Sequence, residues 1–139
     1  MSQPKRLVFA LLSVALITAG CGSNSSTTPT TPTTPESTTE TFEGTITVNG
    51  AVTHPFVVTA PSTITASMGS VSTGTDTVVG LSLGTWNGEF CQIVLANDAA
   101  GEGKFVIGLA QTAGNFCVRV YDSGKLTAPA SYQVTVIHQ

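Results

Sequence analysis

Charged residues are scarce in this sequence, and the cations are fewer than the anions. Only 9% of the 139 residues are charged, with 5 Lys and Arg against 8 Asp and Glu. Two of the five cations, Lys5 and Arg6, lie at the start of the chain. Proteins that bind nucleic acids carry a basic patch or stripe. The charge content therefore argues against a nucleic-acid partner.

The sequence also lacks the patterns of helices and of catalytic sites. No window repeats apolar residues with the 3.6-residue period of an amphipathic helix. No serine lies in a Gly-x-Ser-x-Gly motif, and no Cys–His arrangement indicates a nucleophile. His54 and His138 have no carboxylate or second histidine at ligand spacing, and we interpret both as solvated residues at strand ends. We therefore expect a protein that is not an enzyme and has no metal or cofactor.

Most of the carboxylates fall at expected turns, where Asp accepts hydrogen bonds from nearby backbone N–H groups. They are Asp76, Glu89, Asp98, Glu102 and Asp122. Asp98 and Glu102 lie in NDAAGEG and could hold calcium, but this loop lacks the alternating oxygen ligands of an EF-hand. Local capping is the favoured interpretation.

The chain begins with the pattern of a secretory signal. Lys5 and Arg6 precede an apolar run from Leu7 to Ile17, and small residues follow. This run is shorter than the roughly 20 residues that a transmembrane helix needs. Residues 1–20 are therefore expected to be a removed signal rather than a membrane span.

Ala19-Gly20-Cys21 resembles the lipobox of bacterial lipoproteins, in which the cysteine is acylated and becomes the new N-terminus. The family usually has Leu three places before the cysteine, where this chain has Thr18. The resemblance implies that acylated Cys21 anchors the protein in a lipid bilayer of the bacterial envelope. This would be the outer membrane in a Gram-negative cell, with the domain facing the periplasm or the exterior. The alternative is an ordinary signal that is cut elsewhere.

A polar segment follows Cys21. From Ser23 to Thr41 it has no aromatic or large aliphatic residue, and it contains prolines at 29, 32 and 35. Such a segment cannot bury enough apolar area to offset its ordering entropy. We expect residues 21–41 to be a disordered tether. A plain spacer is favoured over a stalk with glycosylated threonines.

At Phe42 the apolar residues begin to alternate with polar ones, as in half-buried β-strands. Asn49-Gly50 and Asn87-Gly88 each predict a hairpin. Pro55 predicts a strand that starts after it or lies at a sheet edge, and 89–96, apolar on both faces, predicts a central strand. The expected strands are 41–48, 51–60, 62–71, 76–86, 89–96, 104–110, 116–122 and 130–137. This pattern predicts that residues 42–139 form an all-β antiparallel sandwich of about eight strands, with Greek-key or jelly-roll connections.

Four blocks of this domain, in this order, resemble the bacterial pre-peptidase C-terminal domain family. They are GTITVNGAVTHPFVVTAPSTITASM, VLANDAAG, AGNFCVRVYD and SYQVTV. The resemblance implies a jelly-roll-like accessory domain of secreted proteases and envelope proteins, without catalysis of its own. Relatives that bind calcium use an acidic cluster near the start of the domain. Glu43 alone does not make such a cluster, so calcium is not implied here.

Cys91 and Cys117 remain when Cys21 is acylated, and an even pair in an oxidising compartment predicts a disulfide. Two buried thiols are the alternative. Cys117, Arg119 and Tyr121 share one face of their strand. Trp86, next to the second Asn-Gly turn, could stack on a sugar or anchor a partner, or cover one end of the core. Trp86 and Tyr121 are the candidate binding residues.

These observations predict a membrane-anchored lipoprotein that displays a non-catalytic β-sandwich for binding or interaction. Its partner would be a protein or a glycan, in addition to the lipid bilayer. The alternatives are a structural envelope component without a specific ligand and an accessory domain that partners a secreted peptidase.

Overall fold

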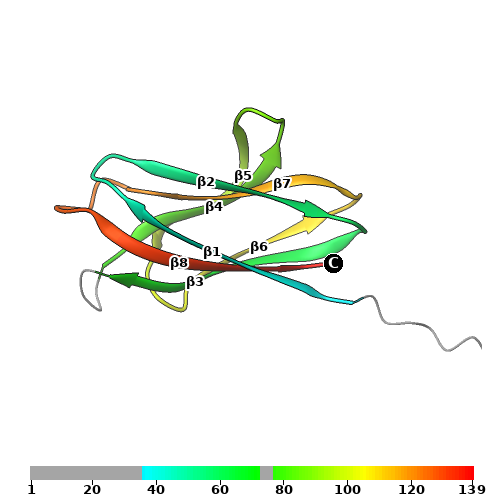
Figure 1. Ribbon diagram of the computed structural model, residues 1–139, viewed down its shortest axis with the longest axis horizontal. Helices are drawn as coiled ribbons and strands as arrows, with labels where there is room; N and C mark the ends of the chain where they lie inside the picture. Colours follow the sequence, from blue (N-terminus) through cyan, green and yellow to red (C-terminus); the bar gives the residue numbers. More distant parts are fainter. Residues whose placement is uncertain (1–35, 73–76) are drawn as a thin grey trace, which may run out of the picture. The chain divides into compact units, whose positions relative to one another are not determined.

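The computed structural model describes residues 36–72 and 77–139; the signal, Cys21 and residues 22–35 of the expected tether lie outside this range. Eight strands lie within the described residues (Figure 1). They are β1 (Thr38–Ile46), β2 (Ala51–Val58), β3 (Ser62–Ser72), β4 (Val79–Trp86), β5 (Cys91–Ala100), β6 (Phe105–Ala110), β7 (Gly114–Tyr121) and β8 (Ala130–His138). None of these residues belongs to a helix long and apolar enough to cross a membrane.

The strands form two four-stranded antiparallel sheets, in the orders β1-β8-β3-β6 and β2-β7-β4-β5. The pairs β1–β8, β2–β7, β3–β6 and β4–β5 are each antiparallel. Pairing of the first strand with the last, the second with the seventh and so on is the topology of a jelly roll. The predicted all-β sandwich with jelly-roll connections is therefore confirmed.

The Asn49-Gly50 turn forms, but it does not close a hairpin. Asn49 has a positive φ of 58°, and the Gly50 N–H donates to the Thr47 carbonyl oxygen over 2.9 Å. β1 and β2, however, lie in different sheets. The hairpin prediction was wrong because a tight turn also connects strands that pass from one sheet to the other. Pro55 lies within β2, and β2 is an edge strand of its sheet. Of the two placements expected for Pro55, the sheet edge is therefore the correct one.

Two strand predictions need correction. β1 begins at Thr38, inside the expected tether, because residues 38–41 pair with the end of β8. β5 is an edge strand of its sheet rather than a central one. Its apolar residues Ile93, Val94 and Leu95 are 41%, 69% and 39% exposed, so the apolar character on both faces reflects an uncovered surface.

The core lies between the two sheets and consists mainly of aliphatic side chains that alternate along the strands. Burial of each such side chain contributes about 1.5–3 kcal/mol to folding. Members of the core include Ile46, Phe56, Val58, Ile64, Met68, Val79, Leu81, Leu83, Val118, Val120, Tyr132, Val134 and Val136.

Both histidines also point between the sheets, so the prediction of solvated strand-end residues was wrong. His54 stacks on Phe42 with 4.8 Å between ring centroids, and its Nε2 shares a 2.7 Å hydrogen bond with the Tyr132 hydroxyl. His138 is 3% exposed and its Nε2 lies 2.8 Å from the Glu40 carboxylate. A polar partner makes the burial of each ring tolerable.

Candidate functional site

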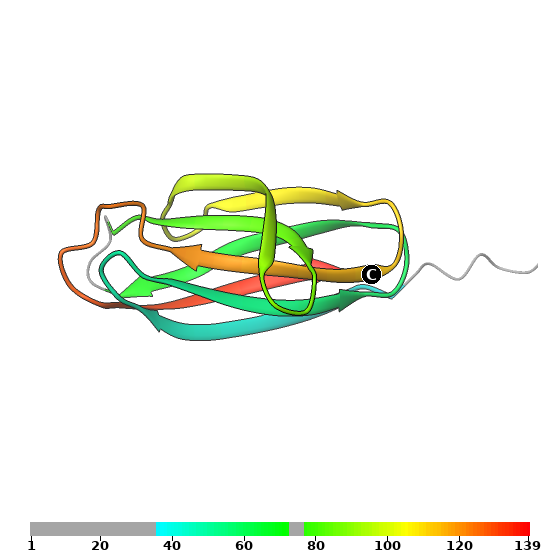
Figure 2. The same ribbon diagram turned by 90° about the horizontal axis from the view of Figure 1, so that it is seen from above.

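A disulfide joins Cys91 of β5 to Cys117 of β7, as predicted. The two strands flank β4 in one sheet, and strands that flank a third lie roughly 9.5 Å apart in a flat sheet. The two α-carbons are only 5.8 Å apart. The start of β5 must therefore leave the plane of the sheet and pass over β4. In Figures 1 and 2 the β4–β5 hairpin stands out from this sheet and crosses above β7.

Gly84 makes this crossing possible. The Gln92 carbonyl oxygen lies only 2.1 Å from the position that a β-carbon on residue 84 would take, so no side chain fits there. The pairing of β4 with β5 also shifts register between Leu83 and Gly84. Such a bulge bends a strand and re-aims its side chains. The glycine and the bulge together allow the main chain of β5 to lie directly on β4.

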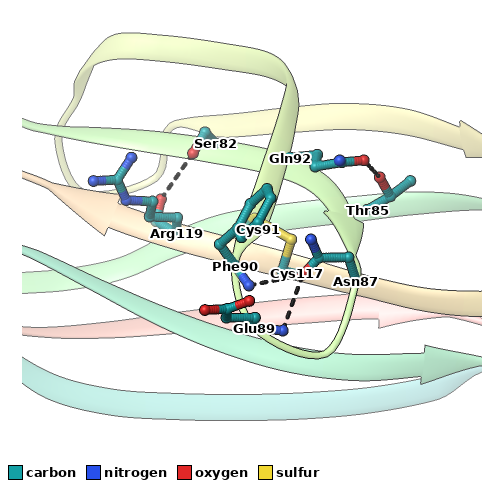
Figure 3. Close-up of a disulfide and its surroundings, with 9 residues drawn as sticks. All are labelled: Ser82, Thr85, Asn87, Glu89, Phe90, Cys91, Gln92, Cys117 and Arg119. Carbon is teal, nitrogen blue, oxygen red and sulfur yellow. Dashed lines mark hydrogen bonds between the residues drawn. A yellow bond between two sulfur atoms is a disulfide. The ribbon is translucent and has the colours of Figure 1, made fainter.

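The loop of this hairpin is fixed by Asn87. Its side-chain oxygen accepts hydrogen bonds from the N–H groups of Glu89 and Phe90, at 2.9 and 2.8 Å. Gly88 supplies a φ of +99°, which other residues rarely adopt. Figure 3 shows the loop lying across the sheet beside the disulfide. Phe90 is therefore presented at a defined place although it is 54% exposed.

A groove of about 320 Å³ lies where the hairpin meets the outer face of the sheet. It is lined by Thr53, Trp86, Glu89, Phe90, Cys91 and Arg119. Two aromatic side chains, one guanidinium and one carboxylate thus converge beside a covalent crosslink. Ligand sites commonly combine apolar walls with a few polar groups of this kind.

Arg119 has no carboxylate partner within the described residues. Its guanidinium carbon lies 5.7 Å from the centroid of the Tyr121 ring, a cation–π arrangement. The Tyr121 ring in turn covers Gly80. The Tyr121 hydroxyl donates a hydrogen bond to the Asp98 carboxylate. Burial, this hydrogen bond and the Asp98 charge raise the pKa of Tyr121 to about 12. Among residues 36–72 and 77–139, the Arg119 guanidinium therefore has an aromatic ring beside it and no ion-pair partner.

The two residues predicted to bind a partner lie at different places relative to the groove. Trp86 lines the groove, whereas Tyr121 lies next to it and contacts Arg119. Glu89, Phe90 and Arg119 were not singled out from the sequence as binding residues. The position of Phe90 directly before Cys91 was the available signal, because a disulfide fixes its neighbours. Cys21 lies outside the described residues.

A second, apolar cavity of about 120 Å³ opens between β5 and β6. It exists because the start of β5 is drawn over β4 and leaves this edge of the sandwich uncovered. Its lining includes Ile64, Leu83, Val94, Leu95, Leu109 and Phe116.

No cluster of three or more His, Cys, Asp or Glu side chains suited to a metal ion occurs in residues 36–72 and 77–139. Asp98, one of the two residues that could have held calcium, accepts a hydrogen bond from the Tyr121 hydroxyl. Its neighbour Asn97 caps the backbone, because its side-chain oxygen accepts a hydrogen bond from the Ala99 N–H.

Fold and disulfide define the class of the protein as a jelly-roll β-sandwich with a disulfide-tethered hairpin. No family model matches the chain, so the resemblance to the pre-peptidase C-terminal domain family stays a prediction. No curated protein matches it either. Among solved structures it is similar to PliG of Aeromonas hydrophila, a periplasmic inhibitor of g-type lysozyme. That similarity has a TM-score of 0.49 and 16% identity, over 70% of this chain and 83% of that one. It is a likeness of strand arrangement and assigns neither a partner nor an activity.

Proposed function

We propose that this protein is an exported, lipid-anchored and non-catalytic binding module whose groove at the β4–β5 hairpin takes a neutral glycan. The observation that carries the proposal is the convergence of Trp86 and Phe90 with Glu89 and Arg119. The disulfide supports export, because such bonds persist in oxidising compartments.

The chemistry of the groove selects the ligand class. A guanidinium offers hydrogen-bond donors only and a carboxylate offers acceptors only, so the site suits hydroxyl groups, which take both roles. A strongly anionic ligand would face Glu89, and a cationic one would face Arg119. Trp86 and Phe90 provide flat apolar surfaces for the carbon-bound face of a sugar ring. A neutral saccharide meets all of these requirements.

Trp86, the one tryptophan of the chain, is a built-in probe of this proposal. The full chain with Cys21→Ser would be titrated with neutral oligosaccharides chosen from a glycan array, with tryptophan fluorescence as the signal. We expect saturable binding that Phe90→Ala and Arg119→Gln each weaken about tenfold or more.

Phe105→Ala is the matched control, because Phe105 is exposed to a similar degree, 56%, on β6 and outside the groove. It should bind like the wild type. Glycan binding that is indifferent to Phe90 and Arg119 would refute the groove. Binding of a protein instead, in a form sensitive to both residues, would replace the glycan by a protein partner.

The membrane anchor is tested separately. Cells that express the full precursor would be labelled with an alkyne fatty acid. The wild type should carry the label and Cys21→Ser should not. A labelled Cys21→Ser protein would contradict the lipoprotein proposal while leaving the groove untouched.

A further inference from the structure

We infer that β6 is a self-association edge, at which two copies of this chain pair their β6 strands antiparallel about a two-fold axis at Ile107. This inference goes beyond the proposed glycan site, which lies on another face of the domain. Figure 2 shows β6 (yellow) along the rim of the sandwich, at the end of the sheet β1-β8-β3-β6.

The four described edge strands differ in how they resist pairing. Exposed edges are commonly protected by charges, proline or bulges. β1 carries Glu40 and Glu43, β2 contains Pro55, and β5 has bulged pairing with β4 and carries Asp98. β6, with the sequence FVIGLA, has no such protection. It therefore presents an unpaired row of backbone groups together with apolar side chains.

The side-chain pattern of β6 is self-complementary. Phe105, Ile107 and Leu109 alternate outward and are 56%, 52% and 70% exposed. In an antiparallel pair centred on Ile107, this residue faces the partner's Ile107, and Phe105 faces the partner's Leu109. Cross-strand apolar pairs of this kind stabilise sheets. No charged residue falls between positions 105 and 110, so two copies of this acidic chain meet there without repulsion.

The exposed apolar area along this edge reaches the lower size limit of a specific protein interface. The two-fold axis passes through both layers, so β5 also approaches the partner's β5, with Val94 and Leu95. The five exposed apolar side chains of one copy present on the order of 500 Å². Two copies therefore bury at most roughly 1,000 Å², the size that a specific interface must reach. Pairing closes after two copies, because β1 at the far edge carries the two glutamates.

Sedimentation equilibrium of the full chain with Cys21→Ser tests this inference. We expect a concentration-dependent dimer in the wild type and a monomer in Ile107→Lys, where two like charges would face each other. Ile137→Lys is the matched control. Ile137 is 42% exposed on the outer face of the same sheet, but it lies on β8 between two other strands. This variant should remain a dimer.

Crosslinking tests the register without relying on a disruptive variant. Ile107→Cys should form an intermolecular disulfide on mild oxidation, because directly opposite residues lie within reach of such a bond. Leu109→Cys, which faces the partner's Phe105, should not. A wild type that stays monomeric at millimolar concentration, a dimer that survives Ile107→Lys, or equal crosslinking at both positions would overturn the inference.

Discussion

The carbonyl oxygen of Gln92 lies directly over Gly84, in the space that a side chain would need. This contact lets the β4–β5 hairpin cross β4 and bring Cys91 to Cys117. Both cavities of interest depend on it, since the crossing builds the groove at Trp86 and uncovers the edge between β5 and β6.

Gly84→Ala should therefore destabilise the domain. The added methyl group meets main-chain atoms of Gln92 and Ile93, which cannot rotate away. Overpacking of this kind costs about 1–3 kcal/mol, measured as a lower midpoint of denaturant unfolding. Gly114→Ala is the control, because its β-carbon would meet only a Phe116 ring carbon, at 3.7 Å. Equal stability of the two variants would show that the crossing is not tight.

The disulfide should contribute a large share of the stability. It closes a loop with a sequence separation of 26 residues, and the chain-entropy model gives about 3–4 kcal/mol for such a loop. Cys91→Ala/Cys117→Ala should melt well below the oxidised wild type but keep its strand content. Trp86 fluorescence should shift to the red as the hairpin loosens. Two alkylatable thiols in secreted wild-type protein would contradict the crosslink.

The sequence allowed most of the fold to be predicted, because alternation and turn residues are local signals. It did not distinguish a hairpin from a connection between sheets, since Asn49-Gly50 satisfies the same backbone geometry in both. It also misplaced β5, because a strand that is apolar on both faces can be buried in a sheet or exposed at an edge.

The site was only partly predictable for a related reason. The cysteine pair followed from counting and compartment, and Trp86 stood out as the one tryptophan of the chain. The convergence of Phe90 and Arg119 depends on the hairpin crossing the sheet, which is a non-local event. His138 looked solvated because it is the penultimate residue, yet Glu40 of β1 and Phe56 of β2 enclose it.

Asp122 ties two turns together, and its loss should lower stability. Its carboxylate accepts hydrogen bonds from the N–H groups of Asn49, Gly124, Lys125 and Leu126. These bonds, that of Asn49 first, lower the pKa of Asp122 below its usual range. A carboxyl group with a depressed folded pKa stabilises the protein above its unfolded pKa, and this stability is lost as the pH falls through the folded pKa.

Asp122→Ala should therefore melt at a lower temperature than the wild type at pH 7, and the difference should shrink below about pH 4. Thermal unfolding followed by circular dichroism at pH 7 and pH 3 measures both effects. Glu102→Ala, which removes an exposed carboxylate from the turn after β5, is the control. A difference between Asp122→Ala and wild type that is the same at both pH values would show that ionisation of Asp122 is irrelevant.

His54 should make stability depend on pH near neutrality. Burial lowers the pKa of His54 below 6.5, so the unfolded chain binds a proton at a higher pH than the folded one. The stability of the neutral, folded form is then complete above about pH 6.5 and falls as the pH drops below this value. Burial also raises the pKa of its partner Tyr132 to about 12, so the phenol does not titrate in this range.

The variant that isolates this effect is His54→Phe, which keeps a ring against Phe42 and removes the titrating group. Between pH 7.5 and pH 5.5, its free energy of unfolding should change less than that of the wild type. The difference between the two slopes against pH should correspond to less than one proton taken up on unfolding, because His54 is only partly buried. Denaturant titrations at several pH values measure the two slopes. Identical slopes would mean that His54 is equally easy to protonate in the folded and unfolded chains.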